Sequence, residues 1–222
     1  MNSQDEAGAA LLDRLGALHT ALLSDVLDAM GAPAVFFGPE VRPLDPGMRL
    51  AGRALTMRTE PMTTPADPPY QELIAGLARV RSADVVLITG ATQTPAGMWG
   101  ELLSIATRAR GGAGVVIDGL CRDVQQVERH DLPVFARGAS PLDSSGRQEV
   151  VEAGGTVSVA GGQVTAGDCL LGDRMGVIAF PADAAEEAIS RAEFKDRAEA
   201  TIRSELEAGG DLATIFARRG IL

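Results

Sequence analysis

The chain has 222 residues and a formal net charge of −10 at neutral pH. This length suits one α/β domain, and a hydrophobic fraction of 45% is ordinary for a globular protein. The acidic balance argues against nucleic-acid binding and against an anionic membrane surface, because both need clustered Lys and Arg. It is compatible with an anionic small substrate, since a few local arginines can attract one.

Cysteine usage and the N-terminal sequence indicate the compartment. Cys121 and Cys169 stand alone without CxxC spacing, which predicts free thiols in a reducing environment. The first residues are polar and acidic, and no apolar run approaches the ~20 residues that a membrane helix needs. We therefore expect a cytoplasmic protein without a secretory signal or a membrane segment.

Helical spacing, Gly and Pro divide the first part of the chain into elements. Residues 9–31 follow a helical pattern, in which Thr20 suits the N-cap of a second helix and Gly31 suits its end. Four prolines place residues 31–48 in a loop. The elements expected next are a strand over 49–59, a Pro-rich break over 61–69 and a short helix from Gln71 to Arg81.

The middle of the chain alternates strands with helices. The runs Asp84–Thr89 and Gly114–Asp118 are short and apolar, which is typical of buried parallel strands. Between them we expect a loop over Gly90–Gly97 and a helix over Met98–Arg110. This order predicts a parallel pair joined by a crossover helix. The elements expected next are a short helix over 122–130 and a strand over Leu132–Ala136.

The last third of the chain changes texture twice. Residues 148–180 are short apolar runs separated by Gly and Asp, which predict small antiparallel strands. From Pro181 onward the pattern is helical, with helices expected over Ala182–Glu207 and Leu212–Arg218. The whole pattern predicts an α/β fold in a single domain over 1–222, with a central parallel or mixed sheet, a small antiparallel β layer and C-terminal helices.

Two charged residues follow the second buried strand. The strand ends at Asp118, Gly119 permits a sharp turn, and Arg122 and Asp123 then begin the short helix. Ligands of open α/β sheets bind beyond the carboxyl ends of the strands. Arg offers a planar fork for a carboxylate, and Asp is a hard oxygen ligand for Mg²⁺ or Mn²⁺. The alternative on spacing alone is an Arg–Asp ion pair that caps the helix.

The preceding crossover helix adds a second candidate feature. Helix N-termini present unpaired N–H groups and bind anions, and Gly97 and Gly100 allow close backbone approach there. Glu101 could reach a metal or its waters, or it is a first-turn acid favoured by the helix dipole. Trp99 is more simply a core residue. His19 and His130 have no partners spaced for a metal site or a catalytic triad.

These motifs together resemble the RraA-like family. The resemblance rests on five stretches of the sequence: Leu23–Asp28, Gly52–Ala54, GELL at 100–103, GAGVVIDGLCRD at 112–123 and LPVFARGASP at 132–141. Gly167-Asp168, Asp173–Val177 and a C-terminal helix with Glu199, Arg203 and Gly209 extend it. The family includes aldolases for 4-hydroxy-4-methyl-2-oxoglutarate and 4-carboxy-4-hydroxy-2-oxoadipate, which also decarboxylate oxaloacetate, and regulators of ribonuclease activity.

The resemblance implies a role for each matching residue. Asp123 would be the direct protein ligand of Mg²⁺ or Mn²⁺, and Arg122 would bind the carboxylate and 2-oxo group of the substrate. Gly100, Glu101, Leu102 and Leu103 would form the rest of the substrate site, with backbone N–H groups near Leu102 and Leu103 and with Glu101 behind the metal. Glu199 would come from a neighbouring subunit. The implied fold is a swivelling β/β/α domain, assembled as a homotrimer or homohexamer.

The implied activity is that of a class II, metal-dependent aldolase or oxaloacetate decarboxylase that acts on a small 2-oxo acid and yields pyruvate. The only lysine is Lys195, which argues against Schiff-base chemistry. A departure from the family is Thr89, where many of its aldolases have an acidic residue, so the distal part of the substrate stays open. The alternatives are a non-catalytic regulator that binds a protein partner, and an enzyme of the same scaffold whose substrate is not a 2-oxo acid.

Overall fold

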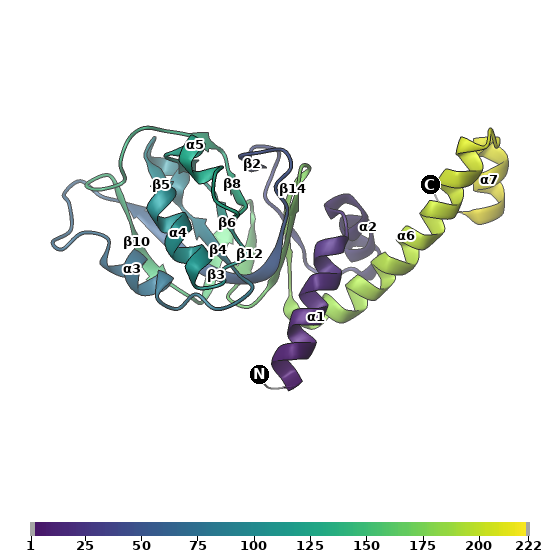
Figure 1. The fold of residues 1–222 in the computed structure, drawn as a ribbon, viewed down its shortest axis with the longest axis horizontal. Helices are drawn as coiled ribbons and strands as arrows, with labels where there is room; N and C mark the ends of the chain where they lie inside the picture. The colour runs from purple at the N-terminus through teal and green to yellow at the C-terminus, as the bar shows by residue number, and fades with distance from the viewer. Residues whose placement is uncertain (1–2, 221–222) are drawn as a thin grey trace.

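The computed structural model describes residues 3–220, and a mixed β-sheet forms its centre (Figure 1). Within this part of the chain the sheet has nine strands, in the order β1-β14-β13-β3-β4-β6-β8-β2, and β10 pairs with β3. The strands are β1 (Val35–Phe36), β2 (Arg42–Pro43), β3 (Leu50–Pro61), β4 (Asp84–Thr89), β6 (Gly114–Ile117), β8 (Val134–Ala136), β10 (Gln148–Ala153), β13 (Cys169–Asp173) and β14 (Gly176–Phe180).

Strands β3, β4, β6 and β8 run parallel, as their buried sequences predict. Val86 of β4 lies between Leu55 of β3 and Val115 of β6. The expected strand at Asp84–Thr89 is confirmed, and the one from Gly114 ends one residue earlier than predicted, at Ile117. The two short strands β1 and β2 fall within the proline-rich stretch that was expected to be entirely loop.

Both faces of the parallel strands are covered, which is why these strands are apolar without alternation. One face packs against α3 (Gln71–Leu77) and α4 (Glu101–Ala109), with Met57 and Ile88 fully buried between them. The other face packs against Phe37 and the hairpin of β11 (Thr156–Val159) and β12 (Gly162–Thr165). This hairpin confirms the small antiparallel layer, whereas β13 and β14 join the main sheet.

A second small sheet was not predicted. It consists of three parallel strands, β5 (Gly97–Trp99), β7 (Leu120–Cys121) and β9 (Gly138–Ala139). The loop expected over residues 90–97 therefore contains a short 3₁₀ turn, η1 (Ala91–Gln93), and ends in a strand. The prediction that the helix begins at Met98 is wrong, because residues 97–99 pair with a strand far along the chain and α4 begins only at Glu101.

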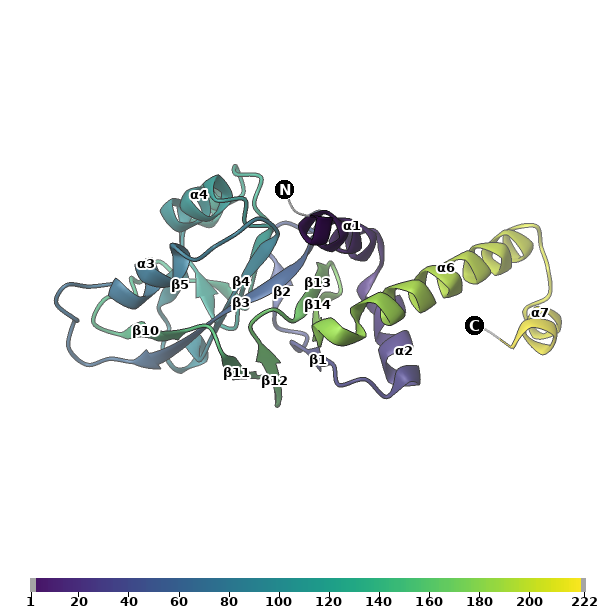
Figure 2. The same cartoon turned by 90° about the horizontal axis from the view of Figure 1, so that it is seen from below.

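The terminal helices pack on the same face of the sheet as α3 and α4, at the end formed by β13 and β14 (Figure 2). Helices α1 (Ser3–Ala17) and α2 (Thr20–Met30) pack with the first part of α6 (Ala185–Glu207) over β13 and β14. Beyond this contact α6 extends away from the sheet, and α7 (Leu212–Arg219) folds back at its far end. No helix among residues 3–220 has both the length and the apolar character needed to cross a bilayer.

Helix α2 is capped from another part of the chain. The expected N-cap Thr20 is wrong, because His19 occupies that position and makes no side-chain capping bond. Thr20 instead donates its backbone N–H and its hydroxyl to Asp173, over 2.9 and 2.8 Å. Gly31 ends the helix in the left-handed conformation, as predicted.

Candidate active site

A pocket of about 290 Å³ opens beside the small three-stranded sheet, at the N-terminus of α4. It is the place where the carboxyl end of β4 leads into β5 and that of β6 leads into β7. The lining residues are Tyr70, Leu73, Ile74, Gly97, Met98, Trp99, Gly100, Glu101, Leu102, Leu103, Arg122, Asp123, Asp143 and Ser144. Six residues that the sequence placed at the site, Gly100, Glu101, Leu102, Leu103, Arg122 and Asp123, are thus brought together.

Two glycines let the arginine and the aspartate reach the pocket. A β-carbon at Gly97 would lie 2.3 Å from Cγ of Arg122, and one at Gly100 would lie 2.7 Å from Oδ2 of Asp123. Both distances are well inside van der Waals contact. The glycines are therefore required by the close approach of the two side chains.

The prediction that Arg122 and Asp123 begin a helix is wrong, because the helix begins at Val124. Asp123 precedes α5 (Val124–Val127) with φ of 52°, in the left-handed region, and its carboxylate makes no capping hydrogen bond. The alternative that Arg122 and Asp123 form a capping ion pair is wrong, because Arg122 pairs with Asp143 instead. Left-handed conformations cost energy for residues other than glycine and often occur at functional sites. Tyr70, also in the pocket lining, has φ of 61°.

Arg122 is fixed at its backbone and at one end of its guanidinium. Its N–H donates to the carbonyl of Trp99 over 2.7 Å, which joins β7 to β5. Its Nη1 lies 2.9 Å from Oδ1 of Asp143. Its Nε is buried and has no hydrogen-bond partner within the described chain. Buried polar atoms are seldom left unpaired, so this nitrogen indicates that a partner is missing.

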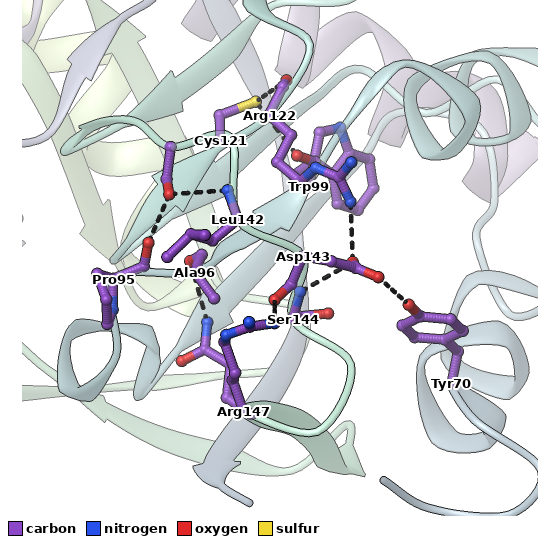
Figure 3. A network of polar contacts seen from close by, with 12 residues as sticks. Tyr70, Pro95, Ala96, Trp99, Cys121, Arg122, Leu142, Asp143, Ser144 and Arg147 are labelled. Carbon is purple, nitrogen blue, oxygen red and sulfur yellow. Dashed lines mark hydrogen bonds and ion pairs between the residues drawn. The ribbon is translucent and has the colours of Figure 1, made fainter.

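Asp143 and Tyr70 belong to the site although the sequence analysis did not select them (Figure 3). The Tyr70 hydroxyl donates to Oδ2 of Asp143 over 2.8 Å, and the N–H of Ser144 donates to Oδ1 over 2.8 Å. Burial acts to raise the pKa of Asp143, but the Tyr70 and Ser144 hydrogen bonds and Arg122 outweigh it and lower that pKa. Asp143 is thus an anion at neutral pH.

A signal for Asp143 was present in the sequence. It follows the strand Leu132–Ala136, whose parallel neighbour leads to Arg122, so both residues come from the carboxyl ends of adjacent strands. The backbone then brings them close, because Gly97 forms a bridge with Asp143 and its N–H donates to the Leu142 carbonyl over 3.0 Å. Nothing comparable in the sequence marks Tyr70.

The N-terminus of α4 supplies the third part of the site. Its first backbone N–H groups, near Leu102 and Leu103, have no partner within the helix and carry the positive end of the helix dipole. Glu101 lies in the first turn, and its Oε1 is 3.4 Å from Nε2 of His130. His130 therefore contacts a site residue, which the sequence analysis did not anticipate.

Several other expectations concern residues outside the pocket. Glu199 lies on α6 beside Lys195 and is absent from the pocket lining of its own chain. Thr89 is buried in the sheet, where its carbonyl accepts a hydrogen bond from Thr59. Burial raises the pKa of the Cys121 thiol to about 12, so it is not a nucleophile at neutral pH.

The donor set of the pocket suits a hydrated divalent cation. No group of three or more His, Cys, Asp and Glu side chains arranged for a metal is found among residues 3–220. One carboxylate is enough for Mg²⁺, which keeps several waters and binds through one or two protein carboxylates. Asp123 offers such a carboxylate in the space that Gly100 leaves open. The residues present therefore fit Mg²⁺ or Mn²⁺.

The fold and the pocket define the class: an α/β protein with a pocket beyond the carboxyl ends of its parallel strands, lined by Arg122, Asp123 and Asp143. The RraA-like family model, described as Aldolase/RraA, matches residues 20–179. The chain belongs to the RraA-like family.

Relatives differ in how much of their length the chain covers. Protein DlpA of Legionella pneumophila is 25% identical over 202 residues, which are 91% of this chain and 32% of DlpA. An uncharacterized protein of Methanocaldococcus jannaschii is 31% identical over 133 residues, 60% of this chain and 63% of that protein. The chain thus spans less than two thirds of both relatives. A Halalkalibacterium halodurans protein provisionally named 4-hydroxy-4-methyl-2-oxoglutarate aldolase is 22% identical over 178 residues, 80% of each chain.

Solved structures confirm the fold. An uncharacterized protein from Pseudomonas syringae has a TM-score of 0.82 at 26% identity, over 93% of this chain and 96% of that one. A second structure is RraAS2 of Streptomyces coelicolor, described as an unusual member of the RNase ES inhibitor RraA family. Its TM-score is 0.79 at 24% identity, and the match covers 87% of this chain and 96% of RraAS2. The likeness to RraAS2 shows the fold alone.

Proposed function

We propose that the protein is a divalent-metal-dependent lyase that cleaves 4-hydroxy-2-oxo acids by a retro-aldol reaction, decarboxylates oxaloacetate, or does both, with pyruvate as product. The observation that carries the proposal is the buried Nε of Arg122, which has no hydrogen-bond partner. The next residue is Asp123, whose carboxylate makes no capping hydrogen bond to α5. A guanidinium, together with a carboxylate that could hold a divalent metal, matches a 2-oxo acid, which offers one carboxylate and a neutral 2-oxo oxygen as a chelating pair.

Both reactions require the side chains mainly to supply charge and to hold the substrate in position. In retro-aldol cleavage the C4 hydroxyl loses a proton and the C3–C4 bond breaks. Its electron pair remains as the enolate of pyruvate, which takes up a proton at C3. In decarboxylation the same bond breaks and CO₂ leaves. A divalent metal held by Asp123 would act as the Lewis acid that stabilises the enolate charge.

The remaining residues position the substrate. Arg122 would bind the carboxylate and 2-oxo oxygen with a fixed positive charge, which is worth most in a pocket sheltered from water. The N–H groups near Leu102 and Leu103 would hold the same carboxylate, and Glu101 would lie behind the metal. Leu102 is 77% exposed in the single chain, which suits a site completed by a second subunit. We place Glu199 of that subunit there, in a homotrimer or homohexamer.

A non-catalytic regulator that binds a protein partner is the second candidate. It draws on the fold shared with RraAS2, whose description names a ribonuclease inhibitor family. The unpaired Arg122 Nε favours the enzyme, because a docking surface does not need an unsatisfied buried donor.

The test is pyruvate release from 4-hydroxy-2-oxo acids and from oxaloacetate, with the protein depleted of metal and then supplied with Mg²⁺ or Mn²⁺. We expect release above the free-metal rate only with metal present. Arg122→Lys should reduce kcat/KM by about 10²-fold or more, because an ammonium cannot replace the planar fork. Release at the free-metal rate from every substrate would reject the lyase and favour the regulator.

A further inference from the structure

We propose that Tyr70 and Asp143 are positioning residues that act in series on Arg122. The Tyr70 hydroxyl holds the Asp143 carboxylate, and Asp143 holds one end of the Arg122 guanidinium so that its Nε stays available to the substrate. The role rests on the proposed function, in which Arg122 binds the carboxylate and 2-oxo oxygen. All three residues belong to one chain and line one pocket, so the contacts that join them do not depend on a second subunit.

The Arg122 guanidinium needs an anchor to keep one orientation. Its side chain has several rotatable bonds and loses rotamer freedom when it is fixed. The backbone bond from Arg122 to the Trp99 carbonyl fixes only the start of that side chain. Asp143 fixes the far end, where its Oδ1 lies 2.9 Å from Nη1. Because the guanidinium is planar, a contact at Nη1 also limits the direction in which Nε points.

Asp143 is itself held by donors other than Arg122. The N–H of Ser144 donates to Oδ1 and the Tyr70 hydroxyl donates to Oδ2, each over 2.8 Å (Figure 3). The backbone is fixed as well, because Gly97 forms a bridge with Asp143. Asp143 should therefore keep its place when the Arg122 side chain is shortened, which makes its role as an anchor testable.

Tyr70 reaches Asp143 from a different element, the start of α3. Its backbone is left-handed, with φ of 61°, and its carbonyl accepts a helical hydrogen bond from the N–H of Ile74 over 2.9 Å. Burial, followed by the hydrogen bond to Asp143, raises the pKa of the phenol. The hydroxyl is thus protonated at neutral pH, where it can donate to a carboxylate but cannot act as a base.

The direction of the guanidinium matters because a two-point contact with a carboxylate has strict geometry. Small misplacements of a group that binds the reacting part of a substrate are costly in rate. Asp143→Asn keeps the shape of the side chain but removes the charge that attracts Arg122, so kcat/KM should fall by about tenfold or more. Tyr70→Phe removes one donor of several and should cost less.

The first measurement tests whether the two residues act in series. Pyruvate release with Mg²⁺ is measured from oxaloacetate or 4-hydroxy-2-oxoglutarate, whichever the wild type cleaves faster, in Asp143→Asn, Tyr70→Phe and the double variant. The control is Asp131→Asn, since the Asp131 side chain is 90% exposed and pairs with Arg108 on the surface. Because Tyr70 acts through Asp143, the double variant should lose no more than Asp143→Asn alone. Losses that multiply in the double variant would overturn the proposal.

The second measurement separates positioning from a general effect on the fold. In Arg122→Ala, Asp143 keeps its other donors, so added ethylguanidinium can bind beside it in place of the missing side chain. Millimolar ethylguanidinium should raise the rate of Arg122→Ala by about tenfold or more. It should restore nothing in Arg122→Ala/Asp143→Asn. Equal rescue in both variants, or rescue in neither, would overturn the proposal while leaving the lyase in place.

The third measurement needs no turnover. Tyr70 is the only tyrosine of the chain, so the ultraviolet absorbance of tyrosinate on alkaline titration reports its hydroxyl alone. Asp143→Asn should lower the pKa of Tyr70, because the neighbouring anion is removed while the Arg122 charge remains. Asp131→Asn should leave that pKa unchanged. An unchanged pKa in Asp143→Asn would overturn the link from Tyr70 to Asp143. Pyruvate release by wild type at only the free-metal rate would instead count against the proposed function.

Discussion

Gly100 lies so close to Asp123 that a β-carbon at position 100 would be 2.7 Å from the carboxylate oxygen Oδ2. The Gly100 backbone is extended, with φ of −163°, so a side chain there would cause no backbone strain. The glycine is therefore explained by the space that the carboxylate occupies, and its replacement tests the position of that carboxylate.

Gly100→Ala should displace the Asp123 carboxylate and reduce metal affinity and kcat/KM by about tenfold or more, since small misplacements at a reacting centre are costly. The unfolding free energy should change by less than about 1 kcal/mol, because the Asp123 side chain can move aside from the added methyl group. Metal titration and urea denaturation measure the two effects. Gly16→Ala in α1, where the new carbon would meet Ala51 at an ordinary 3.4 Å, is the control and should leave both unchanged or slightly stabilise the protein. Normal metal binding by Gly100→Ala would contradict the assigned site.

Asp173 joins the start of α2 to the end of β13. Its carboxylate accepts from the backbone and hydroxyl of Thr20 and from the N–H of Met175 over 2.8 Å. Asp173→Ala should lower the unfolding free energy by about 2–4 kcal/mol, because three donors lose a buried acceptor. Chemical denaturation measures this loss. Asp168→Ala removes one exposed turn bond from the Thr165 N–H and should cost less than about 1 kcal/mol. Similar losses in both variants would show that the hydrogen bonds from Thr20 to Asp173 contribute no more to stability than an exposed turn hydrogen bond does.

Cys169 should make stability fall at alkaline pH. Burial raises the pKa of its thiol to about 11, against about 8.5 for an exposed thiol. Between these values the unfolded chain ionises and the folded chain does not, so the folded state loses stability as pH rises above about 8.5. Comparing urea midpoints of wild type and Cys169→Ala from pH 7 to pH 10, we expect wild type to lose about 1–2 kcal/mol more than the variant. Parallel pH curves would refute the buried, protonated thiol.

The sequence predicts the elements whose signals are local. The strand Asp84–Thr89 is a continuous apolar run between Asp84 and Gly90, and it is predicted with its observed bounds. The strand Gly97–Trp99 is missed because three residues carry no periodicity and its partner, Leu120–Cys121, lies over 20 residues further along. Pairings between distant segments depend on the whole sheet.

The same distinction applies to the pocket. Arg122, Asp123 and the start of α4 follow strands that the sequence identifies, so their meeting could be predicted. Asp143 follows the next parallel strand, so the sequence also indicated that it lies at this edge of the sheet. Its contact with Arg122, however, depends on the alignment of β7 with β9 and on the bridge from Gly97 to the following loop. The prediction that Asp123 starts a helix failed because its backbone is left-handed. Aspartate tolerates this conformation, but its presence in a sequence does not predict it.

The most direct test of the lyase is the metal dependence of pyruvate release in wild type and in Asp123→Asn. We expect Mg²⁺ or Mn²⁺ to raise release well above the free-metal rate in wild type and in the surface control Asp131→Asn. Asp123→Asn should lose this stimulation by about 10²-fold or more, because the amide is a poor ligand for a hard cation. If Asp123→Asn retained wild-type stimulation by metal, Asp123 would not be the metal ligand and the proposed site would be wrong.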